Sequence, residues 1–308
     1  MKTAFVFPGQ GSQYVGMGKD LHDNFEEVRG IYKEASEALD YNVAELSFHG
    51  PKEELDKTFR TQPCLLTASY AAFQVLAAKG INPAYVAGHS LGEYSAITAS
   101  GALSFRDAVK LTQKRGQYMQ EAVPEGKGLM AAVIGLDRET IQQVCSAVES
   151  GYVAAANFNC PGQTVIAGEK PAVEEAMKRA DEAGAKRALA LAVSVPSHCK
   201  LMSGASGQLS SLLRTIDVQA PQFPIVNNAD ARLLDNPEDI KDSLVRQLNT
   251  PLLWEDSITF MVDNGVDTFI EVGPKTVLSG LIKRIARDVR IYHVEDTKSL
   301  ESTLSTSV

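Results

Sequence analysis

Short apolar runs along the chain alternate with longer segments in which apolar residues recur every three or four positions. The short runs predict strands at residues 3–7, 84–87, 128–134, 152–158, 163–167, 187–195, 223–227, 268–272 and 290–294. The longer segments predict helices at residues 63–79, 139–148, 170–183, 237–248, 252–263 and 276–286, and a further helix that begins at Ser104. This alternation is typical of an α/β protein with a mainly parallel sheet.

The order of the predicted elements changes in the middle of the chain. Between residues 127 and 195 it is strand, helix, strand, strand, helix, strand, which is the ferredoxin-like arrangement. We therefore expect a small subdomain at 127–195, inserted between residues 1–126 and 196–308 of a larger α/β subdomain. Ligand sites commonly lie in clefts between such parts, so a site is expected where they meet.

Composition narrows the possible partners. The 308 residues are 44% apolar, and 30 basic against 38 acidic side chains give a net charge of −8. Without a basic tract, binding to nucleic acid or to a membrane surface is not expected. The four cysteines have no metal-ligand spacing, and the first apolar run is too short for a signal peptide. These features predict a cytoplasmic protein with reduced thiols.

The sequence GHSLG at residues 88–92 follows the apolar run 84–87 directly. A strand, then G-x-S-x-G, then a helix is the signature of a nucleophile elbow. The glycines permit a tight turn that carries the Ser90 hydroxyl at its apex, and the N–H of Leu91 then points to where an oxyanion would form. The alternative is an ordinary glycine-rich turn, but the flanking segments favour the elbow. Ser90 is the predicted nucleophile.

Two of the five histidines are candidates for the general base that a serine nucleophile needs. His198 follows a proline where the inserted segment ends, a position that suits a fixed base. His293 is the rival, because Asp267 or Glu271 followed by His293 would match the chain order of α/β hydrolases. His293, however, lies within a predicted strand rather than in a loop.

Arg115 lies on the same face of its predicted helix as Ala108, Leu111 and Met119. A buried arginine stays protonated and needs an anionic partner, but no acidic residue stands three or four positions away. The partner is then a distant carboxylate, or a substrate carboxylate held bidentately; alternatively the side chain reaches the surface. Spacing alone favours a structural role.

The segment FPGQGSQ at residues 7–13 follows the first predicted strand. It lacks the lysine and spacing of a phosphate-binding loop. It is either a turn whose backbone N–H groups and Gln10 amide line a polar site, or a plain connection between strand and helix.

Taken together, these motifs resemble the malonyl-CoA:acyl carrier protein transacylases of bacterial type II fatty acid synthesis. The motifs, in order, are FPGQGSQ at 7–13, GHSLGE at 88–93, QKRG at 113–116, NCPGQ at 159–163, VPSH at 195–198 and EVGP at 271–274. The resemblance covers essentially the whole chain. It implies an α/β-hydrolase-like core that carries the elbow, with a ferredoxin-like subdomain inserted.

The resemblance also implies a ping-pong acyl transfer. Ser90 would be acylated, with His198 as general base and then acid. The backbone N–H groups of Gln10 and Leu91 would form the oxyanion hole. The malonyl group would pass from malonyl-CoA to the phosphopantetheine thiol of acyl carrier protein.

Three further roles follow from the resemblance. Arg115 would clamp the malonyl carboxylate, the opposite of what spacing alone favours. Gln247, in the last turn of a predicted helix, would support the histidine through a carbonyl near its position, and Asn159 would be a polar residue of the cleft. No metal or cofactor is implied, because the carrier protein supplies its own phosphopantetheine, and we expect a monomer.

Docking of an acidic carrier protein would need local cations, since the chain is acidic in total. The candidates are Lys275, Lys283, Arg284 and Arg287, or Lys186 and Arg187. Two other function classes remain open at this point. One is a hydrolase that uses Ser90 and His293, and the other is a binding module without catalysis.

Overall fold

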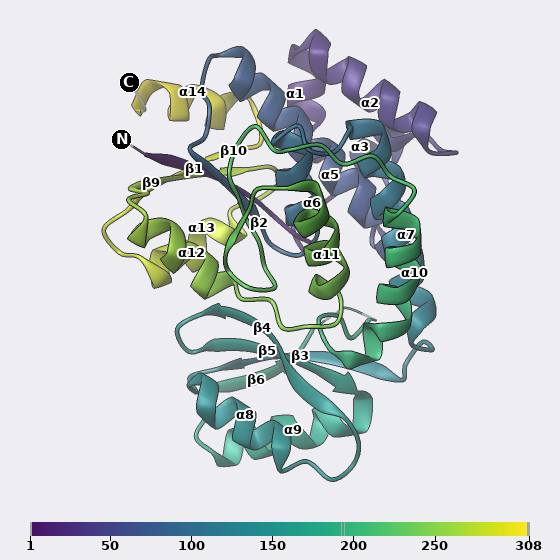
Figure 1. Ribbon diagram of the computed structural model, residues 1–308, viewed down its shortest axis with the longest axis vertical. Coiled ribbons are helices and arrows are strands. Elements are labelled where there is room, and N and C mark those ends of the chain that lie inside the picture. Colours follow the sequence, from purple (N-terminus) through teal and green to yellow (C-terminus); the bar gives the residue numbers. More distant parts are fainter. Residues whose placement is uncertain (1, 192, 194, 307–308) are drawn as a thin grey trace.

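A computed structural model describes residues 2–191, 193 and 195–306, and it contains two β-sheets, each covered by its own helices (Figure 1). The six-stranded sheet lies in the upper part of the view and the four-stranded sheet in the lower part. The protein is therefore an α/β fold built from one mixed sheet and one separate antiparallel sheet.

The six-stranded sheet has the order β10-β9-β1-β2-β7-β8. Its neighbours pair in parallel except β7 with β8, which are antiparallel. The strands are β1 (Thr3–Phe7), β2 (Tyr85–Gly88), β7 (Ile225–Val226), β8 (Leu233–Leu234), β9 (Thr268–Val272) and β10 (Arg290–Val294). Strands β2 and β9 and all but the first residue of β1 are buried, as expected where helices cover both faces of a parallel sheet.

Helices pack on both faces of this sheet. They are α1 (Lys19–Asn24), α2 (Glu26–Ala38), α3 (Val43–His49), α4 (Lys52–Leu55), α5 (Thr58–Ala78), α6 (Leu91–Ala99), α7 (Phe105–Ala122), α10 (Ser203–Leu213), α11 (Pro237–Gln247), α12 (Trp254–Asp263), α13 (Val277–Ile285) and α14 (Thr297–Thr306), with a 3₁₀ turn at Lys200–Met202. The long α5 is almost wholly buried, and Phe73 packs edge-on against Phe5 and Phe7 of β1. None of the helices among the described residues is long and apolar enough to cross a membrane.

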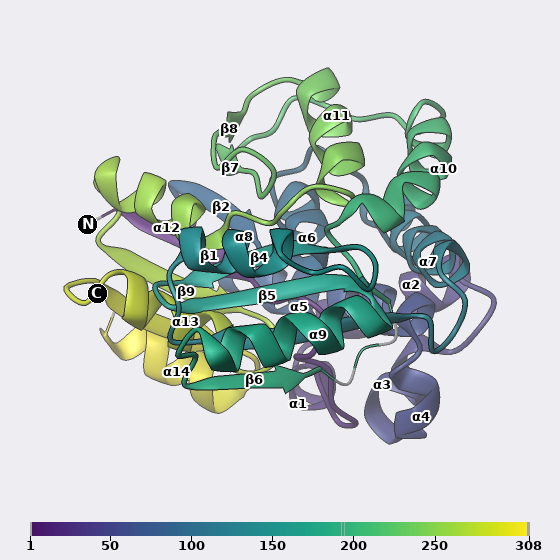
Figure 2. The same ribbon diagram turned by 90° about the horizontal axis from the view of Figure 1, so that it is seen from below.

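The four-stranded sheet has the order β4-β5-β3-β6, with every pair antiparallel. Its strands are β3 (Gly128–Ile134), β4 (Val153–Cys160), β5 (Gln163–Glu169) and β6 (Arg187–Ala190). Helices α8 (Arg138–Ser146) and α9 (Lys170–Glu182) cover the face turned away from the larger sheet (Figures 1 and 2). The opposite face, with Met130 and Val165, contributes to the junction between the two parts.

One edge of the four-stranded sheet is closed by a distant segment. Leu252 forms a β-bridge with Asn157 of β4. Its carbonyl accepts the N–H of Phe158 at 2.9 Å, and its own N–H donates to the carbonyl of Ala156 at 2.8 Å. The segment that follows α11 thus connects the larger part of the protein to the four-stranded sheet by hydrogen bonds.

Most predicted elements are present, with shifts at their ends. Helix α5 begins at Thr58, five residues before the predicted start, because Pro63 lies inside the helix instead of in its first turn. The predicted strand at 187–195 ends at Ala190, and its positions 192 and 194 lie outside the described residues. Helices α1 to α4, α10 and α14 and strand β8 were not predicted from the sequence.

Candidate active site

Ser90 lies between β2 and α6 in a strained turn, with φ +53° and ψ −104°. A Cβ atom on Gly88 would lie 1.9 Å from the carbonyl group of Gly92, and one on Gly92 would lie 1.9 Å from the carbonyl oxygen of Phe7. Only glycine therefore fits on either side of the serine. The tight turn between strand and helix that was predicted at Ser90 is therefore present.

His198 contacts the Ser90 hydroxyl, with 2.8 Å between Nε2 and Oγ. Its Nδ1 lies 2.7 Å from the backbone carbonyl oxygen of Gln247, the last residue of α11. A carbonyl only accepts, so Nδ1 carries the proton and Nε2 is free to accept the serine proton. The N–H of His198 also donates to the carbonyl of Leu248 at 3.0 Å, which fixes the backbone that carries the ring.

The environment of His198 keeps its imidazole neutral. The side chain is 1% exposed. Burial, together with the positive charge of Arg115, lowers the pKa of His198 to about 3. The ring is thus in its basic form at neutral pH, as proton abstraction requires.

Arg115 is buried beside the same hydroxyl. Its Nη2 donates to Ser90 Oγ at 3.1 Å and to Gln247 Oε1 at 2.9 Å, and its Nη1 donates to Gln62 Oε1 at 2.9 Å. The guanidinium also lies 5.1 Å from the centre of the Tyr94 ring. Among the described residues no carboxylate forms an ion pair with it. The expected structural salt bridge is wrong, and so is the expectation that the side chain reaches the surface.

Two backbone N–H groups next to the nucleophile have no acceptor among the described residues: those of Gln10 and Leu91. The N–H of Ser90 itself is occupied, because it donates to Asn228 Oδ1 at 2.8 Å. The Gln10 side-chain amide turns away and donates to Thr58 Oγ1 at 3.3 Å. The two N–H groups predicted for the oxyanion hole therefore have no other partner among the described residues.

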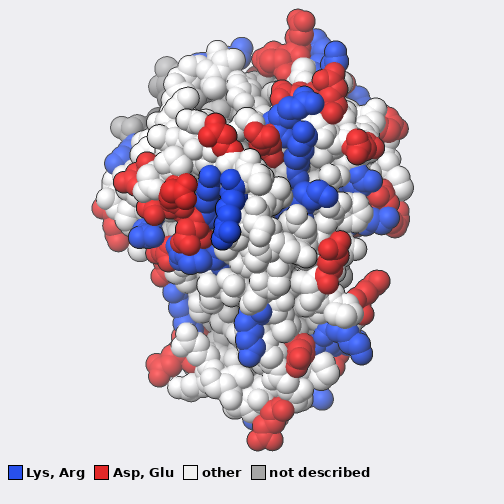
Figure 3. Space-filling view, turned by 45° about the vertical axis from the view of Figure 1, so that its right-hand side comes forward, with Lys and Arg blue, Asp and Glu red and all other residues white. Residues whose placement is uncertain are grey.

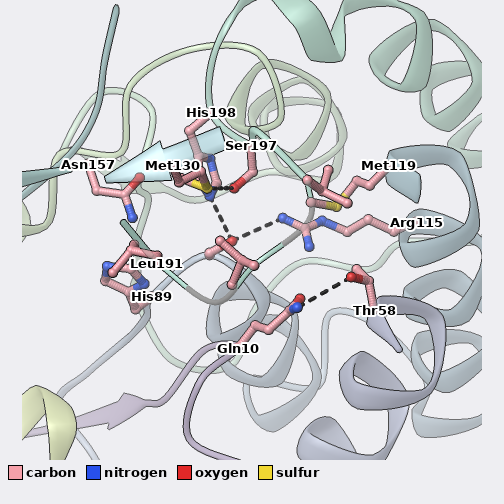
Figure 4. A pocket seen from close by; sticks show the side chains of 13 residues that line it. Gln10, Thr58, His89, Arg115, Met119, Met130, Asn157, Leu191, Ser197 and His198 are labelled. Carbon is pink, nitrogen blue, oxygen red and sulfur yellow. Dashed lines mark hydrogen bonds between the residues drawn. The ribbon is translucent and has the colours of Figure 1, made fainter. Parts of the chain in front are cut away.

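A cavity of about 100 Å³ opens above Ser90 (Figure 4). Arg115 and His198 reach the serine hydroxyl from two sides of it. The lining is polar around the serine and apolar beyond it, and comprises Gln10, Thr58, His89, Ser90, Arg115, Met119, Met130, Asn157, Leu191, Val193, Val195, Ser197 and His198. Pockets that bury drug-sized ligands measure about 300–1,000 Å³, so this smaller space suits a short acyl group.

Asn159 does not line this cavity, in contrast to the prediction. Its Oδ1 lies 2.9 Å from Nε2 of His89, so it contacts the cavity only through that ring. Asn157 lies at the cavity instead, and its buried Oδ1 has no hydrogen-bond partner among the residues that the structure describes. The pairing of β4 with β5 shifts register between Ala155 and Asn157 and again between Phe158 and Cys160, where Asn159 lies, and sequence periodicity does not reveal such irregularities.

His293 is not part of the site. It lies on β10 with Nε2 3.7 Å from Glu295 Oε1, and it does not line the cavity. The carboxylate of Glu271 accepts the N–H groups of Leu278 and Ser279 and so caps α13. The rival assignment of the base is therefore wrong.

Three residues of the site were missed in the sequence: Gln62, Glu93 and Asn228. Asn228 braces the elbow, because its Nδ2 donates to the carbonyl of Gly88 at 2.8 Å while its Oδ1 accepts the N–H of Ser90. Of the three, only Glu93 belongs to a motif recognised in the sequence, as the last residue of GHSLGE. Within the described residues no cluster of three or more His, Cys, Asp or Glu side chains could hold a metal ion.

The acyl transferase domain family matches residues 4–302 of this chain. The chain is 50% identical over 303 residues to the malonyl CoA-acyl carrier protein transacylase of Escherichia coli strain K12, covering 98% of each protein. It is 45% identical over 307 residues to the protein of that name from Bacillus subtilis strain 168, covering 99% of this chain and 97% of the relative.

Solved structures agree with these similarities. An acyl carrier protein S-malonyltransferase from Vibrio cholerae superposes with a TM-score of 0.96 at 48% identity, covering 98% of this chain and 100% of that one. A malonyl-transacylase in complex with a type II PKS acyl-carrier protein superposes with a TM-score of 0.97 at 48% identity, covering 99% of both chains.

Proposed function

The chain belongs to the acyl transferase domain family, and from this membership we infer that it is a malonyl-CoA:acyl carrier protein transacylase. It moves the malonyl group from malonyl-CoA to the phosphopantetheine thiol of acyl carrier protein, through an acylated enzyme, in fatty acid biosynthesis. The observation that carries the residue assignment is the 2.8 Å contact of His198 Nε2 with Ser90 Oγ at the elbow.

In the first half-reaction Ser90 Oγ attacks the thioester carbonyl while its proton passes to His198 Nε2. The carbonyl oxygen becomes an oxyanion that accepts the free N–H groups of Gln10 and Leu91. Collapse of this intermediate breaks the carbon–sulfur bond. The proton on His198 then goes to the departing sulfur, so coenzyme A leaves as a thiol.

The second half-reaction repeats these steps in reverse with a different thiol. His198 removes the proton from the phosphopantetheine thiol, and the sulfur attacks the ester carbonyl on Ser90. The carbon–oxygen bond to Ser90 then breaks, and Oγ takes the proton back from His198. One thioester replaces another, so positioning and oxyanion stabilisation carry the rate without a cofactor of the enzyme. The partner brings its own phosphopantetheine.

We assign the malonyl carboxylate to Arg115. The guanidinium is buried and its hydrogen-bond partners among the described residues are neutral, so an incoming carboxylate would supply the anionic partner. A charge-assisted bidentate pair in a desolvated site is among the stronger hydrogen-bonding arrangements. We assign polar contact with the acyl group or thioester to Asn157, in the role predicted for Asn159, since the unpartnered Oδ1 of Asn157 is at the cavity.

Intact-protein mass spectrometry after mixing with malonyl-CoA tests the assignment. We expect one malonyl adduct on the wild type, no adduct on Ser90→Ala, and discharge of the adduct by carrier protein. Release of free malonate without transfer would instead indicate a hydrolase. Full activity of Ser90→Ala would indicate that the cleft only binds its ligand.

We further propose that the larger part is an α/β-hydrolase-like core at 1–126 and 196–308, with a ferredoxin-like subdomain at 127–195. The strand order β4-β5-β3-β6 with α8 and α9 on one face supports the second assignment. A monomeric, cytoplasmic enzyme remains our expectation.

Local cations near the cavity would receive the acidic carrier protein. Lysine and arginine side chains are interspersed with acidic ones on the face in Figure 3, without one large basic patch. Among the candidates, Lys275 lines a groove together with Gln10 and Lys52, and its Nζ donates to the carbonyl of Gly11 at 3.2 Å. This position supports docking through the group that contains Lys275.

A further inference from the structure

Glu93 is a buried carboxyl group that the reaction described above does not use. It follows the elbow on α6 and is 0% exposed. Its Oε2 accepts the N–H of Asn228 at 3.0 Å and Nε2 of Gln247 at 2.9 Å. Its Oε1 accepts the hydroxyl of Ser243 at 3.3 Å. The carboxyl group thus contacts two residues that themselves hold the elbow.

The contact with Gln247 determines which way that side-chain amide points. Nε2 of Gln247 donates to the carbonyl of Ser90 at 3.0 Å and to Glu93, while Oε1 accepts from Arg115. A reversed amide would bring its NH₂ group against the guanidinium and its oxygen against two acceptors. The oxygen of Glu93 therefore favours the one orientation that binds Arg115.

We propose that Glu93 is a positioning residue for malonyl selectivity: it orients the Gln247 amide, and the amide holds the Arg115 guanidinium ready for the substrate carboxylate. This inference rests on the proposed function. Gln62 holds Nη1 and Gln247 holds Nη2, so the guanidinium is fixed at both nitrogens before substrate arrives. Without the Gln247 contact one of these two supports is lost.

The position of the oxygen matters here, and the charge does not. Glu93 and Arg115 form no ion pair, and Oε2 can accept both N–H groups whether or not Oε1 carries a proton. Burial raises the pKa of Glu93 to about 7, and its hydrogen bonds and the charge of Arg115 oppose that rise. Shape and charge can therefore be separated by substitution.

Two conservative variants make this separation. Glu93→Gln keeps an oxygen at the same distance and removes the charge. Glu93→Asp keeps the charge and retracts the oxygen by about 1.5 Å, the length of one carbon–carbon bond. Ser243→Ala is the matched control, because it removes a contact of Oε1 and leaves the Oε2 contacts in place.

The readout is the ratio of kcat/KM for malonyl-CoA to that for acetyl-CoA, which lacks the carboxylate. We expect Glu93→Asp to lower the ratio about tenfold, mainly through KM for malonyl-CoA, and Glu93→Gln and Ser243→Ala to stay within about threefold of the wild type. Gln247→Met is the second variant if Glu93→Asp does not fold. It removes the amide but keeps the carbonyl that supports His198, and it should lower the ratio as well.

Other outcomes overturn the proposal. These are an unchanged ratio in Glu93→Asp or in Gln247→Met, an equal loss with both substrates, or a loss in Glu93→Gln as large as that in Glu93→Asp. If the wild type transfers malonyl groups but Glu93→Asp has the same ratio of kcat/KM values as the wild type, only the role of Glu93 is overturned. A wild type that transfers none overturns the proposed function too.

Discussion

The backbone carbonyl oxygen of Gln247 lies 2.7 Å from Nδ1 of His198, so a neutral acceptor orients the base. A carboxylate in that place would stabilise an imidazolium strongly, whereas a carbonyl at the end of α11 does so only through its dipole. The nearby charge of Arg115 opposes the imidazolium further. In the proposed reaction, the proton that His198 takes from Ser90 would thus be held weakly and would pass readily to the departing sulfur.

Replacement of His198 by alanine should abolish malonyl-serine formation. Loss of a general base costs about 10²- to 10⁴-fold, and the rate of adduct formation after rapid mixing with malonyl-CoA measures it. His293→Ala is the control, because that side chain lies outside the cavity, and it should react like the wild type. A wild-type rate of adduct formation in His198→Ala would show that His198 is not the general base.

Replacement of Arg115 by alanine should shift preference from malonyl-CoA toward acetyl-CoA. A charge-assisted contact contributes about 1.5–3 kcal/mol, so the malonyl rate should fall about 10- to 100-fold in competition assays while the acetyl rate falls less. Lys114→Ala removes an exposed neighbouring cation and should change neither rate. Equal losses for both substrates would exclude the clamp.

The acylation rate should persist into acidic solution. With a pKa of about 3, His198 stays deprotonated as pH falls through 6.5, where an ordinary histidine would take up a proton. We expect kcat/KM for malonyl-CoA, which reports the free enzyme, to show no loss of the base between pH 7 and about 5.

Arg115→Ala offers a check on the cause of this low pKa. The variant removes the cation that disfavours the imidazolium, so its acid limb should move to higher pH. If kcat/KM of the wild type falls with a midpoint near pH 6.5, the expectation of a neutral base is contradicted.

Gly92→Ala should destabilise the fold severely. The new Cβ would lie 1.9 Å from the carbonyl oxygen of Phe7, and backbone rather than a flexible side chain would have to move. We expect a loss of more than about 3 kcal/mol in urea unfolding. Gly30→Ala is the matched control, because it lies exposed in α2 with nothing near its Cβ, and it should gain about 0.5–1 kcal/mol.

Charge reversal of the candidate group that contains Lys275 should weaken binding of carrier protein. The variant carries glutamate at Lys275, Lys283, Arg284 and Arg287, and Kd should rise about tenfold at low salt, with a smaller effect at high salt. Lys33→Glu, on the exposed face of α2, is the control. An unchanged Kd would favour the second candidate group, Lys186 and Arg187.

Local patterns predicted the strands with clear boundaries. β1, β3, β9 and β10 begin and end at the predicted residues, because each is a short apolar run between polar residues or turns. Helix α7 begins as predicted, since the Ser104 side chain accepts the N–H of Asp107. In contrast, the predicted start of α5 at Pro63 is wrong, because this proline lies inside the helix.

The reactive pair was predicted from motif and family resemblance, but its supporting network was not. The two amides that hold Arg115 lie 53 and 132 positions away in the chain, on α5 and α11. Their partnership exists only once the helices have packed, and no local periodicity encodes it. The same holds for Asn228, which reaches Ser90 from 138 positions away.

The bridge between Leu252 and Asn157 bears on how the chain can be divided. A fragment that carries residues 127–195 alone lacks Leu252, and its β4 would present unpaired N–H and carbonyl groups along an open sheet edge. Such edges pair with one another, so the isolated fragment should self-associate into aggregates. Engineering that transplants this subdomain into another acyltransferase should therefore carry the 248–252 segment with it.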